Sequence, residues 1–134
     1  MQADNLVIVV TLASLLVYLW TSMRVATARG RHKIIAPAVT GHPEFERAYR
    51  VQMNTLEWLP LYLPSLWLFA YYWNATVAAA IGLVWIVGRI LYALSYVKDP
   101  NRRALGFSLQ ALATAVLLFG ALGKAVTLIA MHGI

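Results

Sequence analysis

Residues 6–23 read LVIVVTLASLLVYLWTSM, and this run contains no charged residue. A helix needs about 20 apolar residues to cross the hydrocarbon core of a bilayer, so the run is long enough to span it. A cleaved signal peptide is the alternative, because Ala26-Thr27-Ala28 fits a cleavage site. The segment before the run holds Asp4 and neither Lys nor Arg, which argues against cleavage. We therefore favour a retained transmembrane helix over about residues 5–26.

The whole chain has the composition of a membrane protein. Of its 134 residues, 61% are hydrophobic and 12% are charged, whereas about 25% of the residues in soluble domains are charged. The net charge is +6, but the basic residues gather in short segments between apolar runs, which indicates membrane topology rather than nucleic-acid binding. The chain has no cysteine, so disulfides and thiolate metal sites are excluded.

Three further helices are expected, at about residues 44–73, 77–97 and 104–131. Pro43 suits the first turn of the second helix. A tight turn around residues 73–76 divides an apolar stretch that is too long for one span. Small residues recur along the fourth helix and predict close helix contact; they are Ala111, Ala113, Ala115, Gly120, Ala121 and Gly123. We predict an all-α fold, an integral membrane four-helix bundle forming a single domain over residues 1–134.

Basic residues predict the orientation of this bundle. They lie in the first interhelical loop (Arg29, Arg31, Lys33) and in the third (Lys98, Arg102, Arg103), while the second loop has no charge. Cytoplasmic loops are enriched in Lys and Arg. We therefore expect loops one and three in the cytoplasm and both termini on the opposite side.

Polar residues share one face in the first half of the second helix. Arg47, Arg50, Asn54 and Glu57 follow each other at spacings of 3, 4 and 3 residues, which is one helical face. A charge near the bilayer centre costs about 2.5 to 3.5 kcal/mol, so such residues are expected to face other protein groups. One interpretation is structural, with Arg–Glu pairs between helices setting their register.

A second interpretation is a ligand site. Arg89, Tyr92 and Tyr96 share a face of the third helix. With the second helix they offer cations for carboxylates, an anion for an ammonium group, and amide and phenol hydrogen bonds, which suit a small zwitterionic peptide. Arg103, at the start of the fourth helix, would stabilise a bound anion and lower the pKa of a bound thiol.

The three histidines are His32, His42 and His132. They show no spacing typical of metal ligands, and no carboxylate or cysteine partner is expected for them. We interpret them as loop or terminal residues and predict no metal site.

Residues 41–60, GHPEFERAYRVQMNTLEWLP, resemble the signature of the MAPEG superfamily, the membrane-associated proteins of eicosanoid and glutathione metabolism. Arg89, Tyr92, Tyr96 and the arginine that opens the fourth helix also match, and the resemblance covers nearly the whole chain. It is greatest to the branch of microsomal glutathione transferases, leukotriene-C synthases and the lipoxygenase-activating protein.

The resemblance implies a homotrimer that binds glutathione as co-substrate, without a metal, between neighbouring subunits near the cytoplasmic side. Carried over by position, the glutathione-binding residues are Arg29, Arg50, Gln52, Asn54, Glu57, Tyr92 and Tyr96. Arg103 matches the catalytic arginine that stabilises the glutathione thiolate, and the neighbouring Arg102 is left open as the alternative.

Two positions depart from the leukotriene-C synthases. Trp58 stands where those enzymes have a tyrosine, and Gly30 where they have a second arginine, with Arg31 beside it. These departures favour a glutathione transferase that acts in detoxification on a broader range of substrates than leukotriene synthesis requires. Peroxidase is expected as an additional activity. Its second substrate would be a hydrophobic electrophilic small molecule or lipid.

Two other functions are weighed against this one. The first is a non-catalytic lipid- or glutathione-binding membrane protein similar to the lipoxygenase-activating protein, which lacks the catalytic arginine. The second is a small channel or transporter, which is least favoured because the polar residues end near Glu57 and Arg89.

Overall fold

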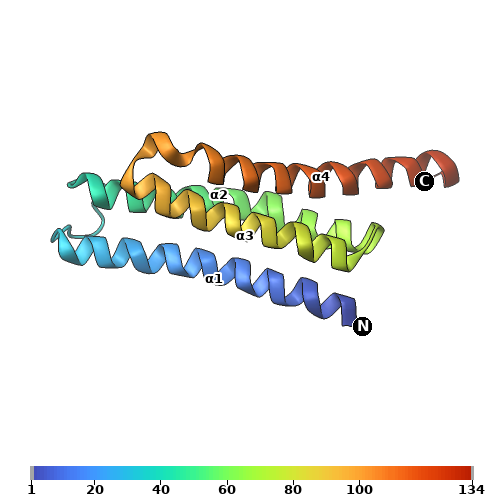
Figure 1. Ribbon diagram of the computed structural model, residues 1–134, viewed down its shortest axis with the longest axis horizontal. Coiled ribbons are helices and arrows are strands. Elements are labelled where there is room, and N and C mark those ends of the chain that lie inside the picture. The colour runs from blue at the N-terminus through green and yellow to red at the C-terminus, as the bar shows by residue number, and fades with distance from the viewer. Residues whose placement is uncertain (1, 134) are drawn as a thin grey trace.

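The computed structural model describes residues 2–133, and within them the chain forms four α-helices and one short 3₁₀-helix (Figure 1). They are α1 (Gln2–Arg31), α2 (Pro43–Tyr72), α3 (Ala75–Lys98), η1 (Pro100–Arg103) and α4 (Ala104–His132). The α1–α2 loop and η1 lie at one end of the bundle, and the α2–α3 turn lies at the other with both ends of the chain (Figure 1). The all-α prediction is confirmed, and the predicted bounds of α2, α3 and α4 agree with the structure to within two residues.

The predicted end of the first helix, at residue 26, is wrong because α1 continues to Arg31. Lys33 adopts a left-handed backbone with φ of 54°. Its N–H donates to the carbonyl of Gly30 at 3.3 Å, and the N–H of Ile34 donates to that of Arg29 at 3.0 Å. These two bonds form a Schellman motif, which satisfies the last carbonyls of a helix. Glycine is the usual residue at the left-handed position, and a lysine there gives little sequence signal.

The predicted turn between the second and third helices is confirmed at Trp73 and Asn74. Asn74 is the N-cap of α3, and its Oδ1 accepts a hydrogen bond from the N–H of Val77 at 2.9 Å. An N-cap side chain satisfies one of the backbone donors that have no partner within the helix.

We expect Asn74→Ala to lower the free energy of unfolding by about 1 kcal/mol, because alanine offers no acceptor to the first turn. Thermal unfolding of the purified protein in detergent measures the change. Asn74→Asp retains a capping oxygen and should unfold close to the wild-type temperature; an equal loss in both variants would contradict the capping role.

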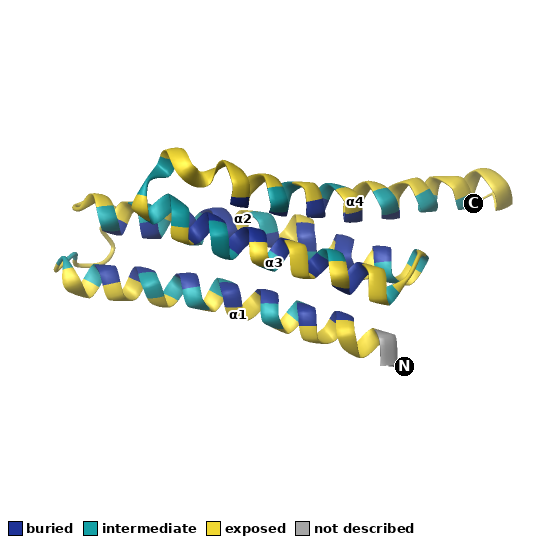
Figure 2. Cartoon of the chain, in the orientation of Figure 1, coloured by how far each residue is buried: buried dark blue, intermediate teal, exposed yellow. Residues whose placement is uncertain are grey.

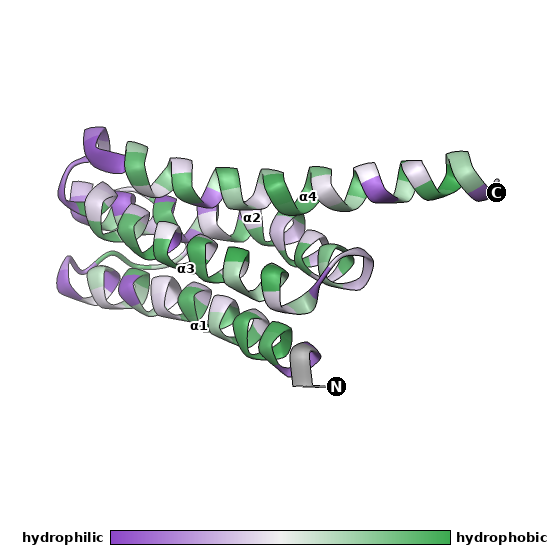
Figure 3. Ribbon diagram, turned by 45° about the vertical axis from the view of Figure 1, so that its right-hand side comes forward, coloured by the Kyte–Doolittle hydropathy of each residue, from purple (hydrophilic) through white to green (hydrophobic). Residues whose placement is uncertain are grey.

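Three helical segments within the described residues are long and apolar enough to cross a membrane: Asp4–Arg31, Ala75–Lys98 and Pro100–His132. The prediction of four membrane-crossing helices is therefore supported for α1, α3 and α4. Helix α2, which carries charges in its first half, is not among these segments. Hydrophobic residues line the helices, and hydrophilic residues gather at the end formed by the α1–α2 loop and η1 (Figure 3).

Buried positions face the neighbouring helices along most of the bundle (Figure 2). In the main core, the rings of Tyr62 and Trp85 stack with centroids 4.0 Å apart. The Tyr62 hydroxyl lies 3.0 Å from Ser14 Oγ and donates to the carbonyl of Gly82 at 3.5 Å, so α1, α2 and α3 meet at this buried hydroxyl. A Cβ on Gly82 would lie 2.5 Å from Val10 Cγ1, which shows how closely α1 and α3 approach.

The closest helix crossing joins α3 and α4 near the η1 end. A Cβ on Gly88 would lie 2.7 Å from the backbone N of Gln110, and a Cβ on Gly106 would lie 2.7 Å from the carbonyl oxygen of Gly88. Only hydrogens fit between these backbones. The crossing fixes the position of the first turns of α4 relative to α3.

Candidate functional site

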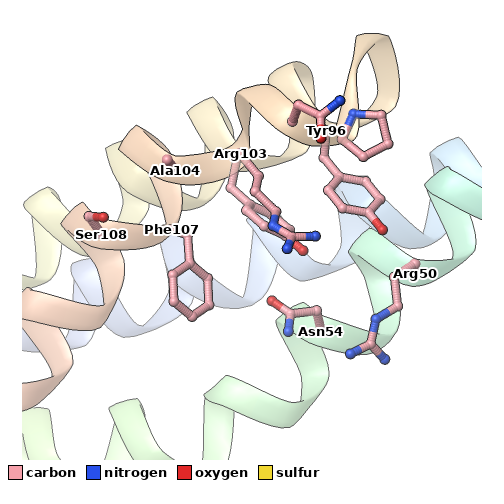
Figure 4. Close-up of a pocket in the computed structure, with 10 residues that line it drawn as sticks. Arg50, Asn54, Tyr96, Arg103, Ala104, Phe107 and Ser108 are labelled. Carbon is pink, nitrogen blue, oxygen red and sulfur yellow. The ribbon is translucent and has the colours of Figure 1, made fainter.

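A cavity of about 590 Å³ opens beside this crossing, between α2, α3, η1 and α4 (Figure 4). Its volume is typical of small-molecule sites, which span roughly 300 to 1,000 Å³. The residues that line it are Arg50, Asn54, Tyr92, Tyr96, Pro100, Asn101, Arg103, Ala104, Phe107 and Ser108. Of the residues assigned to the site from the sequence, the structure brings five together here: Arg50, Asn54, Tyr92, Tyr96 and Arg103.

Arg103 and Arg102 are in different surroundings. Arg103 lines the cavity, and its side chain extends from the start of α4 toward Asn54 of α2 (Figure 4). Arg102 pairs instead with Asp99, with 3.8 Å between Nε and Oδ2, and its side chain is 79% exposed. The geometry therefore favours Arg103 over Arg102 as the arginine that meets a ligand in the cavity.

Asn54 is held in place by Arg89. Arg89 is 1% exposed, and its Nη1 and Nη2 both donate to Asn54 Oδ1 at 3.0 Å. Nη2 also donates to Thr55 Oγ1 at 2.8 Å. Because Arg89 occupies the amide oxygen of Asn54, the group that Asn54 can offer to a ligand is its Nδ2 donor. The interpretation of Arg–Glu pairs between helices does not hold for Arg89, which bonds to neutral groups.

Arg50 forms the outer wall of the cavity. Its Nη1 lies 3.4 Å from Glu57 Oε1, and both side chains are about half exposed. Glu57 does not line the cavity but is connected to it through this pair. Tyr92 and Tyr96 stack with centroids 5.4 Å apart and form the opposite wall.

Two of the predicted glutathione-binding residues, Gln52 and Arg29, lie outside this cavity and bond to other parts of the chain. Gln52 faces α1, where its Nε2 donates to Ser22 Oγ at 3.0 Å. Arg29 donates to the carbonyl of Ala38 at 2.8 Å, and its guanidinium lies 4.7 Å from the centroid of the Phe45 ring. Within one chain, neither residue lines the cavity.

Phe107 and Ser108 line the cavity but were not predicted from the sequence. Phe107 follows Arg103 by about one turn, so the helical period could have placed it on the same face, whereas Ser108 gives no such signal. Trp58 packs edge-on against Phe107, with ring centroids 5.7 Å apart. The cavity thus joins a cationic region at Arg103 to an apolar wall.

Arg47 connects two helices, as the structural interpretation expected, but it bonds to backbone carbonyls instead of a glutamate. Its Nη1 donates to the carbonyls of Val97 and Lys98, both at 3.3 Å. These are the last carbonyls of α3, and a cation is favourable at the negative end of a helix. Arg47 therefore connects α2 to the end of α3 through backbone groups and not through a glutamate.

His32 and His42 lie in the loop between α1 and α2, as predicted, but the expectation that they have no carboxylate nearby is wrong. His32 donates through Nε2 to Glu44 Oε2 at 2.9 Å, and the rings of His32 and His42 stack with centroids 3.5 Å apart. Arg31 Nη1 lies 2.6 Å from Glu44 Oε1. The hydrogen bond from His32, with the charge of Arg31, lowers the pKa of Glu44.

Comparison with known proteins shows similarity over most of the chain. A model of the MAPEG family matches residues 7–123. Microsomal glutathione S-transferase 2 of Homo sapiens is 43% identical over 105 residues, covering 78% of this chain and 71% of the human protein. Leukotriene C4 synthase of Cavia porcellus is 38% identical over 109 residues, which cover 81% of this chain and 73% of that protein. An uncharacterized protein of Synechocystis is 45% identical over 113 residues, which cover 84% of this chain and 82% of that protein.

Proposed function

Because the chain belongs to the MAPEG family, we propose that it is a membrane-bound glutathione transferase acting on hydrophobic electrophiles. The observation that carries the proposal is Arg103, which extends into a cavity that Asn54 and the apolar ring of Phe107 also line. The relatives named glutathione S-transferase and leukotriene C4 synthase support the same reaction class.

The cavity offers a partner for each part of glutathione. Arg50 supplies a guanidinium for a carboxylate, and Glu57 beside it supplies an anion for the ammonium group. Asn54 Nδ2 and the phenols of Tyr92 and Tyr96 supply hydrogen-bond donors for peptide oxygens. The charge-assisted bonds that Arg50 and Glu57 supply are about twice as strong as hydrogen bonds between neutral groups.

Arg103 acts on the sulfur in this proposal. Its positive charge stabilises the thiolate over the thiol, so the proton of the thiol passes to solvent and the anion remains. The thiolate then attacks the electrophilic carbon of a substrate that lies against Phe107. A carbon–sulfur bond forms, and the leaving group departs with its electron pair.

Arg29 and Gln52 support a site shared between subunits. Both match glutathione-binding positions by resemblance, yet both lie outside the cavity of a single chain. We therefore propose a homotrimer in which these residues meet glutathione held by a neighbouring subunit. The basic residues near the α1–α2 loop and η1 support a cytoplasmic location for this end of the bundle.

The proposed function is tested with purified protein in detergent. On addition of glutathione we expect the near-ultraviolet absorbance of a thiolate at neutral pH, followed by conjugation when a simple aryl halide is added. A lipid hydroperoxide in place of the halide tests for peroxidase activity. Binding of glutathione or lipid with neither thiolate absorbance nor turnover would favour the non-catalytic alternative.

A further inference from the structure

Two histidines and a glutamate meet where α1 ends and α2 begins. His32 follows the last residue of α1, His42 is the N-cap of α2, and Glu44 lies in its first turn. One ligand atom from each of the three lies within 4.8 Å of the others. Residues from opposite ends of the loop of residues 32–42 are thereby brought to one point, outside the cavity described above.

The spacing of these atoms is close to that of a coordination shell. Zinc binds histidine nitrogens and carboxylate oxygens at about 2.0 to 2.2 Å, so neighbouring ligands of a tetrahedral ion are roughly 3.3 Å apart. The distance from His32 Nε2 to Glu44 Oε2 is 2.9 Å, and all three ligand atoms lie within 4.8 Å of one another. The two imidazole rings stack with centroids 3.5 Å apart, so one ring must turn out of the stack before both nitrogens point at one ion.

We propose that His32, His42 and Glu44 form a binding site for a divalent transition-metal ion, with zinc the best match, that links the end of α1 to the start of α2. Imidazole and carboxylate ligands suit zinc, and three protein ligands leave its fourth position for water. The ion joins the two ends of the loop of residues 32–42, because His32 lies at one end and His42 and Glu44 lie at the other.

The surrounding bonds are compatible with an ion. Arg31 contacts Oε1 of Glu44 while His32 contacts Oε2, so Oε2 can bind the metal while Arg31 retains Oε1. Carboxylate ligands are commonly hydrogen-bonded in this way. His42 Nδ1 accepts a hydrogen bond from the Glu44 N–H at 3.2 Å. This capping bond is exposed, so water can replace it when the His42 ring turns toward the ion.

Zinc binding to the purified full-length protein tests the proposal, measured by competition with a chromophoric chelator. Any histidine tag is removed and glutathione is omitted, because both bind zinc. We expect one zinc ion per chain. His42→Asn removes the imidazole but retains a good N-cap residue, and we expect it to weaken zinc binding at least tenfold. His32→Gln should do the same from the other side of the site.

His132→Asn is the matched control, because His132 lies at the end of α4, and it should bind zinc like the wild type. Zinc should also raise the unfolding temperature of the wild type and of this control but not that of His42→Asn. Equal zinc binding by the wild type, His32→Gln and His42→Asn would overturn the proposal. Since the site is separate from the cavity, this result does not depend on the proposed transferase activity.

Discussion

Arg103→Ala is expected to reduce the rate of glutathione conjugation roughly a hundredfold at neutral pH. Arg103 reaches the cavity from the start of α4, where its charge would stabilise the thiolate before attack. Removing one preorganised donor from a developing anion typically costs about 10²- to 10³-fold in rate. Conjugation of an aryl halide measures the loss, and the thiolate absorbance should fall with it.

The pH dependence identifies the cause of that loss. A free thiol has a pKa of about 8.5, so raising the pH restores thiolate without help from the protein. The activity of Arg103→Ala should therefore recover toward wild type between neutral pH and about pH 9. Arg102→Ala is the control, because Arg102 pairs with Asp99 away from the cavity. A larger loss in Arg102→Ala than in Arg103→Ala would reverse the assignment.

Gly106→Ala is expected to have the largest effect on stability, lowering the free energy of unfolding by about 3 kcal/mol. The added Cβ would lie 2.8 Å from the Cα of Tyr92 and 2.7 Å from the carbonyl oxygen of Gly88, and it would also meet the backbone N of Tyr92. These are backbone atoms, so no change of rotamer relieves the contact and α3 must move away from α4. Thermal unfolding in detergent measures the loss.

The same substitution should weaken glutathione binding, because α3 and α4 form two walls of the cavity. Gly123→Ala is the matched control in the same helix, since a Cβ there meets nothing within 4 Å. It should leave glutathione binding unchanged and stabilise α4 by up to about 1 kcal/mol, the difference in helix propensity between alanine and glycine. Similar destabilisation by both substitutions would contradict the steric cause.

These two glycines illustrate a limit of sequence-based prediction. The recurring small residues of α4 predict close helix contact, and Ala113 and Ala121 are indeed buried. The tightest contact, however, is at Gly106, whereas a Cβ on Gly123 would meet nothing within 4 Å. Small size permits close approach at either position, but only the crossing point of the two helices determines where it occurs.

The polar residues of the site show the same limit. Arg50 and Asn54 share one helical face by spacing, but Asn54 is buried and bonded to Arg89 while Arg50 is half exposed. Gln52, in the same motif, faces α1 instead of the cavity. The resemblance predicted all three as glutathione-binding residues. The rotation of α2 places Arg50 and Asn54 in the lining of the cavity and turns Gln52 toward α1.

By itself the sequence determined the membrane character of the chain, three of its four helices to within two residues, and the faces that carry charge. These properties depend on hydrophobicity and on the helical period, which are local. Only the tertiary structure decided that Arg103 and not Arg102 reaches the cavity, and that His32, His42 and Glu44 meet. Such contacts depend on where helices end and on how they rotate and cross. Backbone hydrogen bonds set much of this geometry, and because almost any residue type can form them, the sequence shows little sign of it.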